Sequence, residues 1–241
     1  MPHASLDGVF TDPPYFDNVQ YAELMDFCFV WLRLALQDEM PQFRRSTTRA
    51  ADELTGNATL GRGLEHFTAG LSAVFKHYAA AIKPGAPFVF TYHHNDPTAY
   101  VPLVVAILDA QLNCTATLPA VAEMSASLHI AGTNSSVLDS VFVCRVGAAA
   151  IGNDDIEEAL RQDAKALGSS GLRISAGDLR CLAAGHIARL TINLLAPTWD
   201  HAAPLTDRMG RASECILLAT NACETLSLVE DLLGELSKDV A

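Results

Sequence analysis

Two consecutive prolines behind a short apolar run constrain the start of this chain more than any other feature. Residues 6–11, LDGVFT, are typical of a short buried strand, and Pro13-Pro14 follows almost at once. Proline has no backbone N–H, so neither ring can lie within a central strand. Asp12 and Tyr15 flank the pair. The pattern therefore predicts a strand whose carboxyl end presents an acid and an aromatic ring.

Strands and helices alternate through the first 148 residues. Apolar residues at helical spacing predict helices over 18–36 and 64–82, and Asp96-Pro97 can open a third over 98–111. Three further stretches have the composition of strands: FVFTY, CTATLPAV and SVLDSVFVCRV. Such alternation predicts an α/β domain with a parallel sheet, and the last two strands predict an antiparallel hairpin at its edge.

The pattern of predicted secondary structure changes after residue 148, from alternating strands and helices to helices alone. Three later stretches, within 153–171, 176–196 and 207–239, have helical patterns, and none resembles a strand. We therefore predict two parts, an α/β part over 1–148 and a helical extension over 149–241. The extension either packs on the sheet or serves in assembly. The polar segment 37–63 is predicted to be a mobile surface loop.

Charge narrows the classes of partner. The formal net charge is −12, which argues against a protein that coats nucleic acid through a basic face. The only local basic cluster is formed by Arg44, Arg45 and Arg49, with Arg62 further along. Its side chains either contact phosphates or belong to an ordinary solvated loop.

Cysteines and hydropathy bear on the compartment. None of the six cysteines has the spacing of a zinc site, so we expect no metal, reduced core thiols and a cytoplasmic protein. No apolar run is long enough to span a bilayer, and no signal peptide is recognisable, so no membrane partner is predicted.

The chemistry of the prolines and their neighbours suits an amino group on a base. Ligands of open α/β sheets bind beyond the carboxyl ends of strands, where Asp12 would lie. An exocyclic amino nitrogen is conjugated with its ring and is a poor nucleophile. Two acceptors, the Asp12 carboxylate and the rigid Pro13 carbonyl, would localise its lone pair. Tyr15 offers a face on which a flipped-out base can stack, worth about 1–3 kcal/mol.

These residues resemble a known family. The stretch TDPPYFDNVQYAELMDFCFVWL is similar to the amino-group DNA methyltransferases, whose catalytic motif is Asp-Pro-Pro-Tyr. More narrowly it resembles the adenine-specific DNA methylases that carry a zinc ribbon and an uncharacterised N-terminal domain. KPGAPFVFTYHH and DSVFVCR extend the resemblance, and AGDLRCLAAGHIARL does so weakly. It implies a Rossmann-like sheet and methyl transfer from S-adenosylmethionine to adenine N6 in DNA. Aspartate in first place favours adenine over cytosine, guanine or protein glutamine.

The motif, the residues beside it and the basic cluster give a set of candidate site residues. The catalytic group would be Asp12, Pro13, Pro14 and Tyr15. Substrate contacts would come from neighbouring positions and the end of a later strand: Phe16, Asn18, Tyr21, His93 and His94. DNA contacts would come from Arg44, Arg45 and Arg49. Structural roles compete for several of these: Asn18 can cap the next helix, and the histidines can be loop residues beside a cap at Asn95 or Asp96. For Tyr21, and for Trp31 further along the same helix, we favour a place in the core.

One part of the family pattern does not occur. Methylases of this kind hold the cofactor with a glycine-rich turn after the first strand, and here only eleven residues precede Asp12. No permuted copy of the turn and no zinc-ribbon cysteines follow. We therefore expect the chain to be the catalytic half, with incomplete cofactor binding. A missing N-terminal half or a second polypeptide would supply the rest. The alternative is a non-catalytic methylase fold that binds nucleic acid or a protein.

Overall fold

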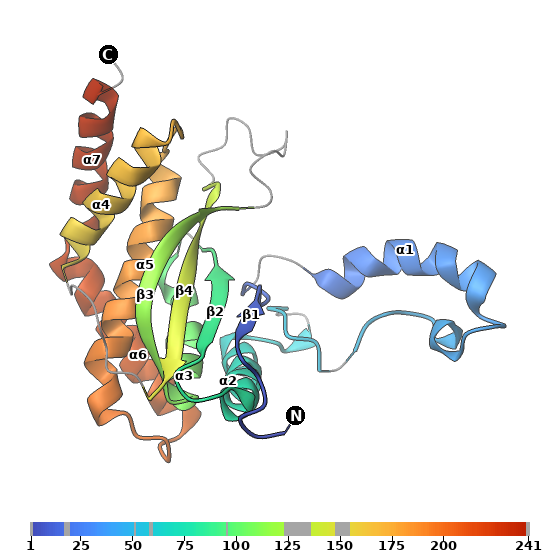
Figure 1. The fold of residues 1–241 in the computed structure, drawn as a ribbon. Helices are drawn as coiled ribbons and strands as arrows, with labels where there is room; N and C mark the ends of the chain where they lie inside the picture. Colours follow the sequence, from blue (N-terminus) through green and yellow to red (C-terminus); the bar gives the residue numbers. More distant parts are fainter. Residues whose placement is uncertain are drawn as a thin grey trace.

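The computed structural model describes residues 2–16, 20–50, 52–57, 60–94, 96–122, 136–147 and 155–239. Its centre is a four-stranded mixed sheet (Figure 1). Across the sheet the strands follow the order β1 (Val9–Thr11), β2 (Pro87–Tyr92), β4 (Leu138–Val146) and β3 (Leu112–Val121). The α/β class predicted from the alternation of strands and helices is therefore confirmed.

The sheet contains a single parallel pair. β1 and β2 run parallel, while β4 is antiparallel to both of its neighbours, β2 and β3. The hairpin of β3 and β4 is confirmed, but its second strand lies inside the sheet and its first strand forms the edge. Pro119 gives a reason, because an edge strand tolerates the missing N–H best.

The predicted helices form, with small changes of boundary. They are α1 (Tyr21–Leu36), α2 (Leu64–Ala81), α3 (Val101–Asp109), α4 (Ile156–Ser169), α5 (Ala176–Leu195), α6 (Leu205–Ala222) and α7 (Thr225–Asp239), with 3-10 turns η1 (Pro41–Arg44), η3 (Pro97–Tyr100) and η5 (Ala196–Thr198). The predicted opening at Asp96-Pro97 is a 3-10 turn, in which the Asp96 carboxylate accepts from the Thr98 N–H at 2.9 Å. The long stretch 207–239 divides at Glu224, whose φ is 42°.

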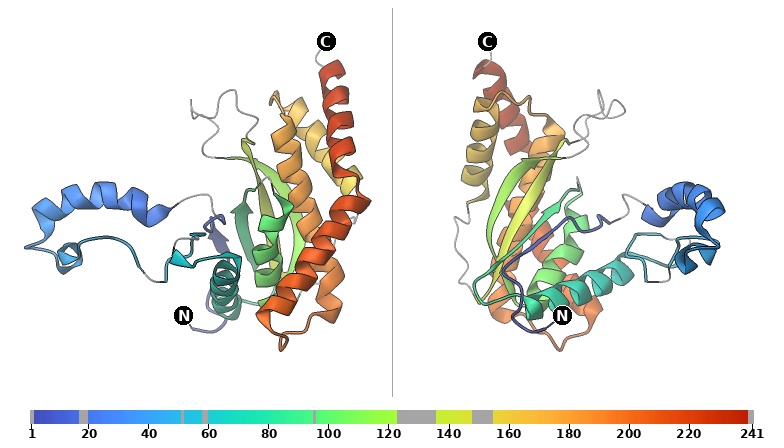
Figure 2. Two further views of the ribbon diagram at one scale, coloured as in Figure 1. Left: turned by 180° about the vertical axis from the view of Figure 1, so that it is seen from behind. Right: turned by 45° about the vertical axis from the view of Figure 1, so that its right-hand side comes forward.

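The core lies on one face of the sheet. The rings of Phe88, Phe90 and Phe142 are buried there, and Phe75 of α2 packs on the first two at 4.9 and 5.2 Å. α3 and α5 pack on the same side as α2 (Figure 2). The strand register brings Phe10, Val89, Val143 and Ala116 together on the opposite face, where Phe10 is 75% exposed.

The helical extension packs directly on the sheet. α5 contacts β3 and β4, and a Cβ at Gly185 would lie 2.3 Å from Ser140 Oγ, so only glycine permits this approach. Ile187 of α5 and Ile216 of α6 belong to the same buried cluster as the sheet residues. Packing on the sheet, one of the two roles expected for the extension, is therefore observed, while the boundary at 148 stays a prediction.

Four burial predictions near the N-terminus are wrong. β1 is an edge strand with only Val9 buried, since no described strand pairs with its other side. Trp31 and Tyr21 were expected in the core, but they are 65% and 43% exposed because α1 projects from the body (Figure 1). For the same reason Cys28, which was expected to be a core thiol, is exposed. All six cysteines are free thiols, as predicted. In the part that the structure describes, no helix has both the length and the apolar character needed to cross a bilayer.

Candidate functional site at the ends of β1 and β2

Asp12 lies at the carboxyl end of β1, and its carboxylate is exposed. Its Oδ1 accepts a hydrogen bond from the Tyr15 hydroxyl at 2.7 Å and a second from the Thr91 hydroxyl. Thr91 is close because β2 runs parallel to β1, so the carboxyl ends of the two strands lie side by side. Both bonds go to one oxygen, and no described residue bonds to Oδ2. The carboxylate is therefore oriented by Oδ1, and Oδ2 can accept a hydrogen bond from a ligand or from water.

Tyr15 is held beside Asp12 by contacts with the end of β2. Its ring meets that of Tyr92 edge to face at 5.2 Å and stacks on that of His93 at 6.5 Å, with 27° between the planes. Burial raises the pKa of the Tyr15 hydroxyl well above its ordinary value near 10. The hydroxyl therefore stays protonated at neutral pH and serves as a donor to Asp12. In the same motif Pro13 is buried and Pro14 is partly buried.

His93 is fixed between the sheet and α5. Its Nδ1 lies 2.9 Å from the Leu138 carbonyl oxygen, 3.3 Å from Asp139 Oδ1 and 3.6 Å from Cys181 Sγ. Burial acts to lower the pKa of the ring, but the bonds to Asp139, Cys181 and Leu138 outweigh it and raise the pKa to about 10. A ring that is already protonated at neutral pH cannot accept another proton. The geometry therefore favours positioning over proton uptake.

We expect His93 to make stability depend on pH. Because its folded pKa is about 10 and the unfolded value about 6.5, the stabilisation is complete below pH 6.5 and is lost as pH rises through 10. Between pH 7 and 10 the wild type should lose on the order of 2 kcal/mol more unfolding free energy than His93→Gln. Urea unfolding at several pH values measures this difference. Parallel losses in the two proteins would contradict the raised pKa.

The structure brings some of the other predicted contact residues to this site and not others. Tyr21 lies near Asp12: its pKa is raised by burial and by the Asp12 charge. The Phe16 ring packs on Phe67 at 5.4 Å, which ties it to the core. His94 accepts the Asp96 N–H at 2.9 Å and so belongs to the turn before η3. Asn18 and Asn95 lie outside the described residues.

The three arginines of the predicted DNA contact lie on the segment that returns along α1. Arg44 donates to the Gln37 carbonyl at 3.4 Å, and Arg45 donates to that of Arg49 at 3.0 Å. Arg49 has acidic neighbours, with Glu23 at 3.4 Å and Asp26 at 3.7 Å. Its charge is therefore already balanced, whereas the described contacts of Arg44 and Arg45 are with carbonyl groups.

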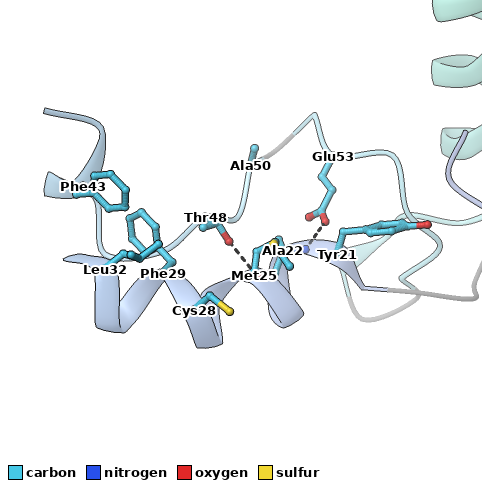
Figure 3. Close-up of a pocket in the computed structure, with 10 residues that line it drawn as sticks. All are labelled: Tyr21, Ala22, Met25, Cys28, Phe29, Leu32, Phe43, Thr48, Ala50 and Glu53. Carbon is cyan, nitrogen blue, oxygen red and sulfur yellow. Dashed lines mark hydrogen bonds between the residues drawn. The ribbon is translucent and has the colours of Figure 1, made fainter. Parts of the chain in front are cut away.

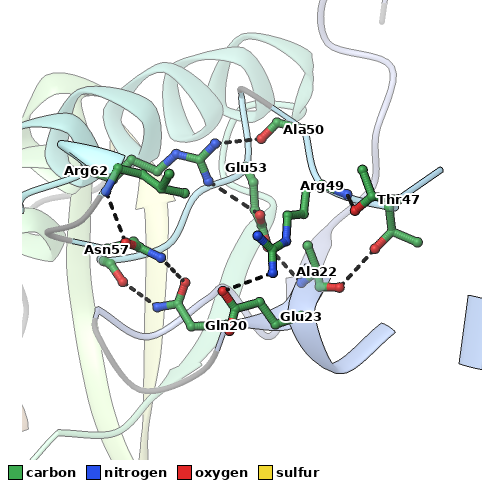
Figure 4. Close-up of polar contacts among 12 residues, drawn as sticks. Gln20, Ala22, Glu23, Thr47, Arg49, Ala50, Glu53, Asn57 and Arg62 are labelled. Carbon is green, nitrogen blue, oxygen red and sulfur yellow. Dashed lines mark hydrogen bonds and ion pairs between the residues drawn. The ribbon is translucent and has the colours of Figure 1, made fainter. Parts of the chain in front are cut away.

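A polar network fixes the N-terminal end of α1 (Figure 4). Glu53 accepts the N–H of Ala22 at 2.9 Å and pairs with Arg62 at 3.4 Å. Gln20 bonds to Asn57 at 3.1 Å and also donates to the Gly56 carbonyl. Arg62, which lies near the basic cluster in the sequence, has a structural role here. Charge counting along the chain does not reveal such a pairing.

Three site residues were missed. Thr91, Asp139 and Cys181 come from β2, β4 and α5 and meet His93 or Asp12 only through tertiary structure. Of the three, only Thr91 could be found from the sequence, as the polar residue near the end of the predicted strand FVFTY. Within the described ranges, no three His, Cys, Asp or Glu side chains gather so as to hold a metal ion.

The residues that follow the described strands bear on the predicted cofactor turn. None of the described strands is followed by a glycine-rich turn, and β1 and β2 are followed by DPPY and HH. Comparisons with protein-family models, with curated proteins and with solved structures find no match to this chain. A function must therefore be argued from the geometry of the site.

Proposed function

We propose that this chain is the catalytic half of a DNA adenine-N6 methyltransferase that uses S-adenosylmethionine. The observation that carries the proposal is the oriented Asp12 carboxylate at an open sheet edge. One of its oxygens is held by two hydroxyls, and the other is left to a ligand. Beside it stands a tyrosine whose ring is fixed by two neighbouring rings.

The proposed chemistry acts on the amino group of the base. Asp12 Oδ2 accepts one N–H of the adenine amino group, and the Pro13 carbonyl accepts the other. Two acceptors draw the nitrogen towards tetrahedral geometry, which localises its lone pair. The face of Tyr15 turned away from His93 stacks on the flipped-out base. Thr91 and Tyr15 hold the carboxylate in place, so little reorganisation is needed when the base arrives.

S-adenosylmethionine would supply the methyl group, and its site needs residues from elsewhere. In doubly wound sheets the ligand crevice lies where the strand order reverses, between two parallel strands. β1 is at the sheet edge, and its free side adjoins Asp12. A parallel strand added there, from a missing N-terminal half or a second polypeptide, would create such a crevice. Its helices would cover the sheet face that carries Phe10 and Leu118, which are 75% and 51% exposed.

Two further parts of the proposal concern partner and compartment. DNA is proposed as the partner from the resemblance to the amino-group DNA methyltransferases, since adenine carries the same amino group in RNA. Free thiols at all six cysteines support a reducing, cytoplasmic compartment.

We expect Arg44 and Arg45 to contact DNA phosphates. Replacing both with alanine should weaken binding to a duplex roughly tenfold near physiological salt. It should also reduce the slope of log K against log [salt] by about two, because each phosphate contact contributes about 0.9. Fluorescence anisotropy over a salt series measures both quantities. Arg161→Ala is the control, since that arginine is bonded to Glu157 and Glu235 on the far helices. A slope equal to that of the wild type would contradict the contact.

The second candidate is a non-catalytic module of the same fold that binds nucleic acid or a protein. The missing glycine-rich turn favours it. The discriminating experiment is methyl transfer from labelled S-adenosylmethionine to an adenine-containing duplex, with N6-methyladenine identified by mass spectrometry. It is run with the chain alone and with the polypeptide encoded directly upstream. N6-methyladenine in either reaction supports the enzyme, while DNA binding without product in both favours the module.

A further inference from the structure

Helix α1 is apolar around most of its circumference and stands away from the body of the protein (Figure 1). Only Ala22 among its sixteen residues is buried. A helix of this kind is normally enclosed by other elements, because each apolar side chain left in water costs free energy. Its principal neighbour here is η1 in the returning segment 37–63. Most of its apolar surface is therefore left for a partner.

The returning segment covers one side of α1. Phe29 stacks on Phe43 at 5.4 Å, and Asp26 accepts bonds from Thr47 at 2.6 Å and Thr48 at 2.7 Å. Between helix and segment lies an open apolar groove of about 460 Å³ (Figure 3). Three bonds from two threonines lower the pKa of Asp26 to about 2, which keeps this carboxylate charged and bonded. This side of the helix is thus already attached to its own chain.

The opposite side of α1 carries a regular apolar seam. Leu24, Phe27, Trp31 and Leu34 follow one another at spacings of three, four and three residues. Their side chains are 59%, 74%, 65% and 65% exposed. This is the spacing of the a and d positions of a coiled coil, over two heptads. The seam has the pattern of a helix that packs along another helix.

We propose that this seam pairs with the same seam of a second copy of the chain, forming a dimer through α1. Charge favours that occupant. Glu23 is the one charged residue at the positions flanking the seam, and Arg49 pairs with it. The other flanking positions are Cys28, Val30 and Ala35, so two copies meet without facing like charges.

The charge of the whole chain also permits pairing through the arm. Residues 20–63 contain six acids and five arginines, so they carry −1 of the formal −12. The remaining charge lies on the body, and like charges on two bodies oppose direct contact. Pairing at the projecting helix keeps the bodies apart (Figure 2). A two-fold axis across the seam gives a closed dimer and no further growth.

The exposed area is sufficient for a specific but reversible interface. The four seam side chains expose on the order of 500 Å², with Phe27 and Trp31 contributing most. With the flanking residues the area approaches about 600 Å² per copy, where specific interfaces begin. An apolar patch of this size marks an interaction site on a protein surface. We therefore expect a dimer with a micromolar dissociation constant.

Sedimentation velocity at about 1–100 µM of the full chain tests the dimer. The wild type should reach twice the mass of one chain at the upper concentrations. Phe27→Glu with Trp31→Glu should weaken association at least about 100-fold, because two aromatic hot spots become charged. Leu217→Glu with Leu218→Glu is the matched control, since both residues are more than half exposed on α6 of the body. That variant should dimerise like the wild type.

A thiol cross-linker gives a second measurement. Cys28 flanks the seam about halfway along it, at the border with the groove, and it is the exposed member of the six cysteines, so pairing through the seam brings the two copies of Cys28 towards each other. A short bismaleimide should join two wild-type chains and leave Cys28→Ser as single chains. A wild-type monomer at 100 µM, or equal association in both glutamate variants, would overturn the proposal. Circular dichroism confirms that each variant folds, and no outcome depends on methyl transfer.

Discussion

Asp12→Ala is expected to reduce adenine-N6 methylation by a factor of about 10²–10³, in the chain alone or in its complex with a second half. The substitution removes the acceptor for one amino hydrogen of the base. It also removes the anchor that the Tyr15 and Thr91 hydroxyls share. Methylation rates at saturating S-adenosylmethionine and duplex measure the loss. Because Asp12 is exposed, the free energy of unfolding should change by less than about 1 kcal/mol.

Two variants make the Asp12 experiment specific. Asp12→Asn keeps an acceptor oxygen without its charge, so its rate should lie between those of the wild type and the alanine variant. Asp7→Ala removes another exposed acid of the same segment, one that pairs with Lys83, and should leave the rate unchanged. Wild-type rates in Asp12→Ala, or equal losses in Asp7→Ala, would remove Asp12 from the proposed chemistry.

Local sequence signals predicted the elements of the fold well. The Pro13-Pro14 pair ends β1, Asp96 caps a turn before α3, and the FVFTY pattern marks β2. Each of these depends on a backbone property of a few neighbouring residues: a missing donor, a capping carboxylate or a period of two. Such properties act wherever the segment lies in space, so the sequence alone reveals them.

Burial was harder to predict than helicity. The spacing of apolar residues over 18–36 predicted α1, but it also suggested that Trp31 and Tyr21 lie in the core, and both are exposed. Periodicity identifies an apolar face and says nothing about what covers it. Gly185 illustrates a contact that periodicity does not reveal. A glycine is needed where α5 approaches β4 because of Ser140, which lies 45 residues earlier in the chain.

The residues of the candidate site also divide into those that the sequence reveals and those that only the tertiary structure reveals. Asp12 and Tyr15 were found because they are neighbours in a short motif, and the structure joins their side chains. Thr91 and Asp139 reach the site through strand pairing, and strand register is not legible in one sequence. The raised pKa of His93 likewise needs the carbonyl and the carboxylate of β4. Part of the electrostatics of the site therefore comes from tertiary contacts that the motif does not contain.

The largest loss of stability is expected from Asp109→Ala. Asp109 ends α3, and its side chain is 1% exposed. It joins α3 to two other helices and to the residue after η5, because it accepts from Ser72 of α2 at 2.6 Å and from Trp199 Nε1 at 3.0 Å, and it pairs with Arg208 of α6. Burial alone would raise its pKa, but the bonds from Arg208, Ser72 and Trp199 lower it. The ionised carboxylate is therefore the form that the fold stabilises.

Removing this carboxylate leaves buried donors without an acceptor and the Arg208 charge, 13% exposed, without a counterion. Breaking a buried ion pair on one side costs about 3–5 kcal/mol, so urea unfolding of Asp109→Ala should show a loss of that size. Glu157→Ala, which removes an exposed partner of Arg161, should cost less than about 1 kcal/mol.

The contribution of Asp109 to stability should depend on pH. Because the pKa of Asp109 is lowered in the folded protein, its contribution is present above the unfolded pKa near 4 and is lost as pH falls through the folded pKa. The difference between wild type and Asp109→Ala should thus shrink in acid. Equal costs for the two alanine variants would mean that Asp109 does not hold α2, α3 and α6 together.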